Sequence, residues 1–151
     1  MLKTILYTFF ISMVPVIELR GAIPAGVAGG LPVFSAALIA IVGNMVPVPF
    51  VLLFTRSVLA YMEKRNKLMQ SLAAKVRAKA EKNRGKVERY KFWGLVLLVA
   101  IPLPGTGAWT GAIVAALLDE EGVKATFAIL LGVLIAAVIV SLITTGVIAL
   151  N

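Results

Sequence analysis

Residues 15–24 of the chain read PVIELRGAIP, and they interrupt an apolar stretch that runs from Leu2 to Leu31. Proline removes a main-chain hydrogen-bond donor and clashes with the preceding helical turn, whereas glycine permits the sharp turns that follow such a break. These helix-breaking residues lie near the middle of the stretch, where a regular membrane span would be most uniform. The stretch is therefore predicted to form a helix, a break and a second helix.

A second apolar stretch, from Phe92 to Leu118, is interrupted in the same way. Residues 102–111 read PLPGTGAWTG and carry no charge, but they offer main-chain amides, two hydroxyl groups and one indole N–H. Amides at the start of a helix bind anions well. We therefore expect a second helix–break–helix unit, whose break exposes polar main-chain groups.

Two further stretches, Val33–Tyr61 and Val123–Leu150, are almost continuously apolar and exceed the roughly 20 residues that a membrane-spanning helix needs. The first contains Asn44, followed by Pro47 and Pro49, so this helix is expected to be kinked. The whole chain is 60% hydrophobic and only 15% charged, with a mean hydropathy of +0.99. This composition is typical of an integral membrane protein rather than of a soluble domain.

The predicted fold is all-α, with two broken helical hairpins and two long transmembrane helices in one membrane domain, residues 1–151. Residues 1–61 hold the first hairpin and long helix, and residues 92–151 hold the second set. Each broken stretch is either a re-entrant hairpin that enters and leaves on one side of the membrane, or a kinked full span. The first stretch is short for two spans and long for one, which favours re-entrant hairpins.

A weak internal repeat relates the two halves of the chain. Residues 21–24 (GAIP) resemble residues 107–110 (GAWT) at an offset of 107 − 21 = 86, and Gly43 corresponds to Gly132 at an offset of 132 − 43 = 89. With re-entrant hairpins, the first half of the chain would start outside the cell and end in the cytoplasm, and the second half would run in the opposite direction. Such an inverted repeat is a common plan of transporters, whose sites lie at discontinuous helices.

The net charge of +8 comes from one segment, because residues 62–91 contain eleven Lys or Arg and three Glu, and 11 − 3 = 8. A basic loop between apolar segments fits the positive-inside rule, which places this segment in the cytoplasm and makes a nucleic-acid partner unnecessary. Leu68, Leu72 and Val76 recur at helical spacing among the basic residues. This pattern predicts an amphipathic helix, ended by Gly85, that binds anionic lipid headgroups of the inner leaflet. A solvated linker helix is the alternative.

Glu18 and Arg20 are charged side chains at membrane depth, where charge is costly unless it faces protein or a wet cavity. They could pair as a structural staple or face a substrate, and we favour the second role, with Glu18 as a proton or cation site. Asn44 could bond to either hairpin tip, although an ordinary interhelical hydrogen bond is the simpler expectation. Arg56 is expected to snorkel towards the cytoplasmic surface. The candidate substrate-binding or ion-binding residues are Glu18, Arg20, Gly21, Pro24, Asn44, Pro102, Pro104, Gly105, Thr106, Gly107, Trp109 and Thr110.

The chain contains no cysteine and no histidine, which excludes disulfides, thiolate metal sites and a histidine base or proton shuttle. It offers neither a catalytic pair of acids nor a nucleophile with its base, and we expect the acidic residues 119–121 only to cap a turn. The second break lacks the Gly-Lys-Ser/Thr of a phosphate-binding loop. We therefore expect no enzyme activity, no cofactor and no metal.

Residues 18–24 (ELRGAIP) and 102–111 (PLPGTGAWTG) resemble the paired motifs of the small multi-drug export proteins of bacteria and archaea. The resemblance covers nearly the whole chain. That family is similar, at a distance, to the DedA (VTT-domain) membrane proteins, in which two re-entrant hairpins face each other and some members are implicated in flipping undecaprenyl phosphate. DedA proteins typically carry Arg beside the Pro-Gly of the second hairpin, and this chain has none there. The resemblance implies a hairpin–helix fold and a transport function in the plasma membrane of a prokaryote, with several membrane passes.

Three functions are compatible with these features. The first is a transporter or lipid flippase in which Arg20 and the hairpin amides hold an anionic or amphipathic substrate and Glu18 couples an ion. The second is an exporter of lipophilic cations, which Glu18 would attract and the Trp109 ring would bind through a cation–π contact. The third is a non-transporting membrane scaffold. A chain this small is expected to form a homo-oligomer in order to enclose a pathway.

Overall fold

The computed structural model describes residues 1–90, 92–103, 105–118 and 122–150, with the main chain alone over residues 83–90. The described residues form eight α-helices and no β-strand, which confirms the predicted all-α class. In chain order the helices are α1 (Leu2–Met13), α2 (Glu18–Ala28), α3 (Val33–Met45), α4 (Pro47–Glu63), α5 (Lys67–Tyr90), α6 (Phe92–Ala100), α7 (Ala108–Leu117) and α8 (Gly122–Ala149).

The first break lies between α1 and α2 and covers residues 14–17. A proline disfavours helical geometry in the residue before it, and Val14, which precedes Pro15, is extended with φ −74° and ψ 126°. Val16 and Glu18 then take positive φ angles of 81° and 50°, a left-handed geometry that is uncommon for residues other than glycine. The chain reverses direction within these few residues.

This break is shorter than predicted, because Gly21 and Pro24 lie inside α2. Pro24 cannot donate to the carbonyl of Arg20, but the loss of this one hydrogen bond does not end the helix, which continues to Ala28. Gly107, which was matched to Gly21 in the internal repeat, precedes α7 instead of lying within it. The two glycines therefore do not occupy equivalent positions.

The second break lies between α6 and α7. Gly105 and Gly107 have φ angles of 86° and 122°, which side-chain-bearing residues rarely adopt. The main-chain N–H of Leu103 donates to the carbonyl of Ile101 at 2.8 Å, and that of Thr106 donates to the carbonyl of Leu103 at 3.2 Å. These tight turns reverse the chain between the two helices.

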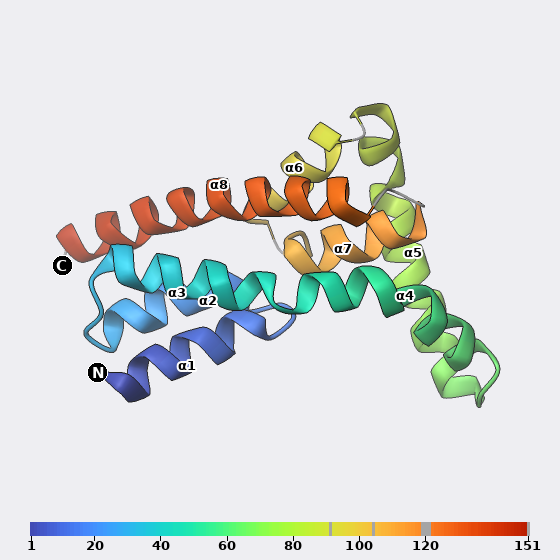
Figure 1. The fold of residues 1–151 in the computed structure, drawn as a ribbon, viewed down its shortest axis with the longest axis horizontal. Helices are drawn as coiled ribbons and strands as arrows, with labels where there is room; N and C mark the ends of the chain where they lie inside the picture. Colours follow the sequence, from blue (N-terminus) through green and yellow to red (C-terminus); the bar gives the residue numbers. More distant parts are fainter. Residues whose placement is uncertain (91, 104, 119–121, 151) are drawn as a thin grey trace.

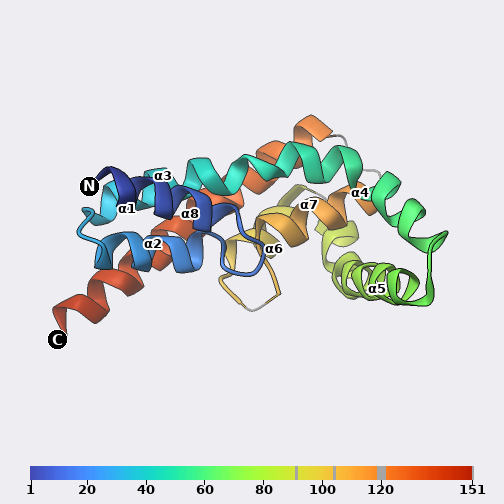
Figure 2. The same ribbon diagram turned by 90° about the horizontal axis from the view of Figure 1, so that it is seen from below.

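The two breaks meet near the middle of an elongated molecule (Figure 1). From there α1 and α2 extend towards the end that holds both termini, and α7 extends towards the opposite end, where α5 lies. The α3–α4 unit and α8 run along the length of the molecule beside them. Figure 2, turned by 90°, shows the same order along the long axis. Helices that are 90 residues apart in the sequence are thus neighbours in the centre.

The α3–α4 unit and α8 are long apolar helices. They cover Val33–Glu63, 31 residues, and Gly122–Ala149, 28 residues, and by length and composition both could cross a membrane. The predicted kink in the first is present at Val46, where Pro47 begins α4. Proline is favoured at this first helical position because its missing N–H would have no partner there in any case.

Two glycines let the first helix of each hairpin approach the long helix of its own half. A Cβ on Gly43 of α3 would lie 2.5 Å from the carbonyl oxygen of Phe9 in α1. A Cβ on Gly132 of α8 would lie 2.9 Å from the carbonyl oxygen of Val96 in α6. Small residues allow such close helix contacts in membrane proteins. The α1–α3 and α6–α8 pairs therefore pack in a similar way.

The central core joins α2 and α7 with the long helices. Its buried side chains are mostly small, which fits closely packed helices. They include Leu19, Ile23, Ala40, Val48, Ala108, Ala112, Ile129 and Val133.

Large apolar side chains also cover the outside of the molecule. Phe34, Phe50, Leu53, Trp93 and Leu142 are each more than half exposed, and they come from α3, α4, α6 and α8. Soluble monomers rarely expose apolar surface on this scale. Such a surface suits a protein surrounded by lipid.

The basic helix α5 continues past Gly85, so the prediction that this residue ends the helix was wrong. A glycine inside a helix costs only about 1 kcal/mol relative to alanine, which the rest of a long helix can offset. Ala73 and Ala80 of α5 are buried, whereas Leu68 and Leu72 remain exposed. Small side chains rather than the leucines therefore form the buried apolar part of α5.

Candidate functional site

Glu18 makes the first contact between the two breaks. Its side chain is only 4% exposed, and Oε1 accepts a hydrogen bond from the main-chain N–H of Trp109 at 3.1 Å. Trp109 is the second residue of α7, where main-chain N–H groups have no partner within their own helix. Glu18 therefore caps α7 from another helix, and its carboxylate faces the positive end of the α7 dipole.

Gly107 makes this approach possible. It is the residue before α7, and a Cβ at this position would overlap the carboxylate of Glu18. Its φ of 122° is a second reason for glycine, since other residues would be strained there. Any side chain at this position would exclude Glu18 from the start of α7.

Arg20 binds the other end of the same break. Its Nη1 donates to the carbonyl of Leu103, and its Nη2 donates to the carbonyl of Ile101 at 3.3 Å and to the hydroxyl of Thr106 at 2.8 Å. These carbonyls follow the end of α6, where the helix dipole is negative. The planar guanidinium offers several donors in a fixed fork, which suits a set of converging acceptors.

Glu18 and Arg20 therefore act on opposite helix ends of the second hairpin. No direct hydrogen bond joins these two side chains, both of which the structure describes, although their opposite charges attract each other. The negative charge of Glu18 faces the positive end of the α7 dipole, and the positive charge of Arg20 faces the negative end of the α6 dipole. The charged residues of the first break thus hold the second break through its main chain.

The Trp109 side chain adds a third link between the hairpins, because its indole Nε1 donates to the carbonyl of Met13 at 3.1 Å. Met13 is the last residue of α1. The hydroxyl of Thr110 stays within the second break and donates to the carbonyl of Gly105 at 3.1 Å. The contacts between the hairpins are thus mostly between side chains and main-chain groups.

Arg56 of α4 lies at the far end of α7. Its Nε donates to the carbonyl of Ala116 at 2.6 Å, in the last turn of the helix. We expected Arg56 only to snorkel towards the surface, whereas it also bonds to the negative end of α7. The short helix α7 therefore has an acid from the first half of the chain at its start and a base from that half at its end.

An apolar groove of about 500 Å³ begins beside the hairpin tips and runs along α4. Among the residues that the structure describes, no charged side chain lines it. Trp109 and Met13 form its wall at the tips, and Val76 of α5 lies at its edge. Phe50 and Phe54 of α4 give it further aromatic surface.

The basic helix also reaches the second break. The Nζ atom of Lys79 lies 3.5 Å from the position that a Cβ would take on Gly105. A cationic group from α5 therefore lies beside the exposed turn of the second hairpin.

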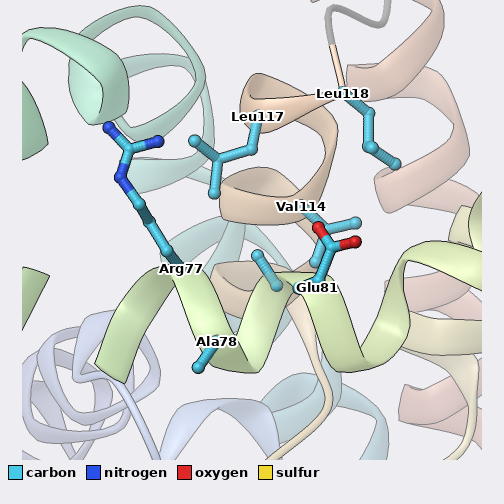
Figure 3. A pocket seen from close by; sticks show the side chains of 7 residues that line it. Arg77, Ala78, Glu81, Val114, Leu117 and Leu118 are labelled. Atoms are coloured by element: carbon cyan, nitrogen blue, oxygen red, sulfur yellow. The ribbon is translucent and has the colours of Figure 1, made fainter. Parts of the chain in front are cut away.

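A separate hollow of about 360 Å³ lies between α5 and α7, away from the hairpin tips. Figure 3 shows Arg77 and Glu81 projecting from α5 on the side that faces Val114 and Leu117 of α7. The Nε of Arg77 bonds to Oε1 of Glu63 at 2.6 Å, which joins α5 to α4. Both partners are nearly half exposed, so this ion pair adds little stability.

A family model described as "Putative small multi-drug export protein" matches residues 18–139, from Glu18 at the first break to the middle of α8. The chain belongs to this export family. No curated protein and no solved structure matches it. Family membership, together with the two long apolar helices, indicates a membrane protein with a transport or export function.

In this export-family chain, the structure brings five of the predicted residues together, and they belong to both motifs. They are Glu18, Arg20, Thr106, Gly107 and Trp109. Gly105 and Thr110 bond within the same break. The motifs at residues 18–24 and 102–111 thus meet in one contact.

The remaining predicted residues lie outside this contact. Pro24 is exposed and lines a groove with Ile143 and Val147 of α8, and Gly21 packs against its own turn at Ile17. Pro102 is partly buried after the end of α6. Pro104 and the acidic residues 119–121 are outside the described part of the chain.

Asn44 is fully buried in α3, but neither atom of its amide has a hydrogen-bond partner among the residues that the structure describes. The predicted interhelical hydrogen bond is therefore absent from the described part of the chain, as is a bond to the described residues of either hairpin tip. The hydroxyl of Ser12, which packs beside Gly43, donates instead to the carbonyl of Phe9 in its own helix at 2.7 Å.

Sequence reasoning missed the partners on which this site depends. The carbonyls of Met13, Ile101 and Leu103 accept hydrogen bonds from the facing hairpin, and main-chain groups carry no signature in the sequence. The only available signal was indirect, since helix ends leave N–H and carbonyl groups without partners. Lys79 was seen only as one of many basic residues of the amphipathic helix.

Proposed function

We propose that this export-family chain is a membrane transporter in which the contact between the two breaks is a gate. The observation that carries the proposal is the placement of Glu18 and Arg20, which bind the start of α7 and the end of α6. Hydrogen bonds to helix ends are broken and remade without unfolding either helix. The hairpins can therefore separate and rejoin as units.

In this proposal the hairpins are re-entrant, so each enters and leaves the membrane on one side. The positions of α1–α2 and α7 at opposite ends of the molecule support this arrangement (Figure 1). The similar packing at Gly43 and Gly132 supports an inverted repeat. The basic helix α5 would then lie at the cytoplasmic surface of a prokaryotic plasma membrane, and both termini would lie on the other side.

Glu18 is the group through which an ion could drive the gate. Its carboxylate suits the start of α7 because a negative charge there interacts favourably with the helix dipole. Protonation would remove the charge and weaken the hydrogen bond from Trp109. Binding of a proton would therefore loosen the contact, and its release would restore it.

The apolar groove supplies the proposed path for the substrate. A groove of about 500 Å³ lined by apolar side chains suits a hydrocarbon or aromatic body. Lys79 beside the second break, and the other basic residues of α5, suit an anionic headgroup. The substrate class we propose is therefore anionic or amphipathic, and lipid flipping of the DedA type is its simplest form.

A second candidate is the export of lipophilic cations. It is favoured by the aromatic rings of Phe50, Phe54 and Trp109 in the groove, since aromatic faces attract cations. In either case the proposal involves transport without chemical conversion, and a homo-oligomer would help to enclose the path.

Reconstitution of the purified chain into liposomes tests the proposal. One set of liposomes carries a fluorescent lipid phosphate and a second set carries a lipophilic cationic dye, with protein-free liposomes as the control. We expect the wild-type chain to move the lipid phosphate across the bilayer and Arg20→Lys to move it several-fold more slowly. Movement of the dye alone would select the second candidate, and movement of neither would leave a scaffold role.

A further inference from the structure

Asn44 is a buried polar side chain that the gate does not use. It is 0% exposed, and both its Oδ1 and its Nδ2 are without a hydrogen-bond partner in the described protein. Buried amides are almost always hydrogen-bonded, so an unpartnered one requires an explanation. An apolar side chain of similar size would avoid the cost of burying these two groups.

The position of Asn44 in α3 places it in the central core. It lies one helical turn after Ala40, a residue of that core, and residues at this spacing share a helix face. It also follows Gly43, where a Cβ would overlap the Oγ of Ser12 in α1. Ser12 precedes Met13, whose carbonyl takes part in the gate contact, so Asn44 lies near the α1 end of the first hairpin.

The helix is also interrupted just after Asn44. Pro47 and Pro49 have no N–H, so they cannot donate to the carbonyls of Gly43 and Met45 four residues earlier. The carbonyl of Gly43 instead accepts a longer bond from Val46 at 3.3 Å. Polar main-chain groups next to a discontinuous helix are a common setting for transporter sites.

The chemistry of the amide restricts what can bind there. A cation would satisfy Oδ1 but not Nδ2, and an anion would satisfy Nδ2 but not Oδ1. A hydroxyl, an amide or a water molecule can donate to one atom and accept from the other. Neutral groups that both donate and accept are therefore the matching class.

We propose that Asn44 is a polar subsite that binds a neutral hydroxyl or amide group, or water, when the hairpin tips part. This inference rests on the proposed gate. With the tips closed, as described here, the amide is fully buried and has no hydrogen-bond partner among the described residues. With the tips open, it faces the path and guides a polar group past the middle of the molecule.

The absence of cysteine from these 151 residues permits a direct test in the intact chain. An Asn44→Cys variant in liposomes is treated with a charged methanethiosulfonate reagent, which reacts only with thiols that water reaches. Ala128→Cys in α8 is the matched control, since Ala128 is also 0% exposed but belongs to a different core cluster. We expect Asn44→Cys to react about tenfold faster or more, because thiol modification requires access and a thiolate. Adding Arg20→Lys, which weakens the gate, should accelerate labelling of the Asn44→Cys thiol further.

Equal, slow labelling of both thiols would overturn the inference. If such a chain still transports the probes, only the subsite is rejected and the gate stands. If labelling does occur, dodecanol and dodecane are compared on Ala40→Cys, one helical turn from an intact Asn44, to distinguish the two sources of the ligand. Protection of the thiol from labelling by the alcohol alone indicates that the ligand is a hydroxyl of an amphipathic molecule. No protection by either compound indicates that the ligand is water. Both results support a subsite that binds neutral hydrogen-bonding groups.

A second variant keeps the test independent of cysteine. Asn44→Leu should raise the thermal midpoint in detergent by about 2–4 °C, because it removes an unpartnered amide from a buried position. It should also slow transport of the lipid phosphate or dye several-fold. A lower midpoint together with unchanged transport would show that Asn44 is only structural, and would contradict the inference.

Discussion

The carboxylate of Glu18 accepts a hydrogen bond from the main-chain N–H of Trp109 at 3.1 Å, across 91 residues of sequence. The contact joins a charged residue of one broken helix to the start of another. Arg20, two residues later, binds the end of α6 on the other side of the same break. Two neighbouring charges of opposite sign thus match two helix ends of opposite polarity.

Glu18 variants should separate the hydrogen bond from the charge. Glu18→Gln keeps an oxygen acceptor for Trp109 and should cost about 1 kcal/mol of stability, mainly through loss of the charge–dipole interaction. Glu18→Ala also leaves the N–H buried without a partner, and should cost about 2–3 kcal/mol. Thermal unfolding in detergent measures both. Equal midpoints for the two variants would show that the hydrogen bond contributes nothing.

Transport by Glu18→Gln should lose its dependence on pH, because an amide keeps the shape of the side chain but does not exchange a proton. The check is the transport rate in liposomes over a series of pH values, with wild-type protein as the reference. A pH profile identical to that of the wild type would remove Glu18 from ion coupling.

Arg20 variants test whether the forked guanidinium is needed. Arg20→Lys retains the charge but replaces the planar fork of donors with a compact ammonium group that does not match its geometry, so it should lose about 1–2 kcal/mol of stability and most of the transport rate. Arg20→Ala should lose more, since it removes all three hydrogen bonds together with the positive charge at the end of α6. A lysine variant with wild-type stability and rate would mean that charge alone is sufficient.

Gly107→Ala should be among the most damaging single substitutions in the chain. The strained φ costs about 1–3 kcal/mol, and the new methyl group also displaces the Glu18 carboxylate. Gly146→Ala in α8 is the control, because nothing lies within 4 Å of a Cβ there and alanine favours helix. The double variant Gly107→Ala/Glu18→Ala should lose less stability than the sum of the two single variants, because the new methyl group no longer overlaps a carboxylate. Additive losses of stability would show that residue 107 and the side chain of Glu18 are not in contact.

The sequence predicted the breaks well where a single residue decides the local geometry. Pro15 fixes the end of α1, and Pro47 fixes the kink at Val46. It failed at Gly85 and Pro24, where the remaining hydrogen bonds of a helix outweigh the local preference of one residue.

The functional residues were predictable, but their partners were not. Glu18 and Arg20 stand out because charge is rare in an apolar stretch. Their partners are main-chain groups far away in the sequence, so no residue type marks them, and the pairing depends on how the hairpins dock. The same limit explains why the lack of a hydrogen-bond partner for Asn44 was not predicted, since its environment depends on the packing of distant helices.

Topology provides a further prediction. If the hairpins are re-entrant, reporters fused at Met1 and Asn151 should both lie outside the cell, and a reporter inserted within residues 62–91 should lie in the cytoplasm. Activity of periplasmic and cytoplasmic reporter enzymes at each site measures this. Cytoplasmic signals from both termini would replace the re-entrant hairpins with four full spans.

The most direct measurement of the gate is transport by a chain whose hairpins are chemically locked. The indole of Trp109 bonds to the carbonyl of Met13, so cysteines at these two positions can be joined by a short, reducible cross-linker in a chain that has no other thiol. The gate account predicts that the Met13→Cys/Trp109→Cys chain transports before cross-linking, stops when cross-linked and recovers after reduction. Undiminished transport by the fully cross-linked chain would contradict it and leave the contact as a structural staple.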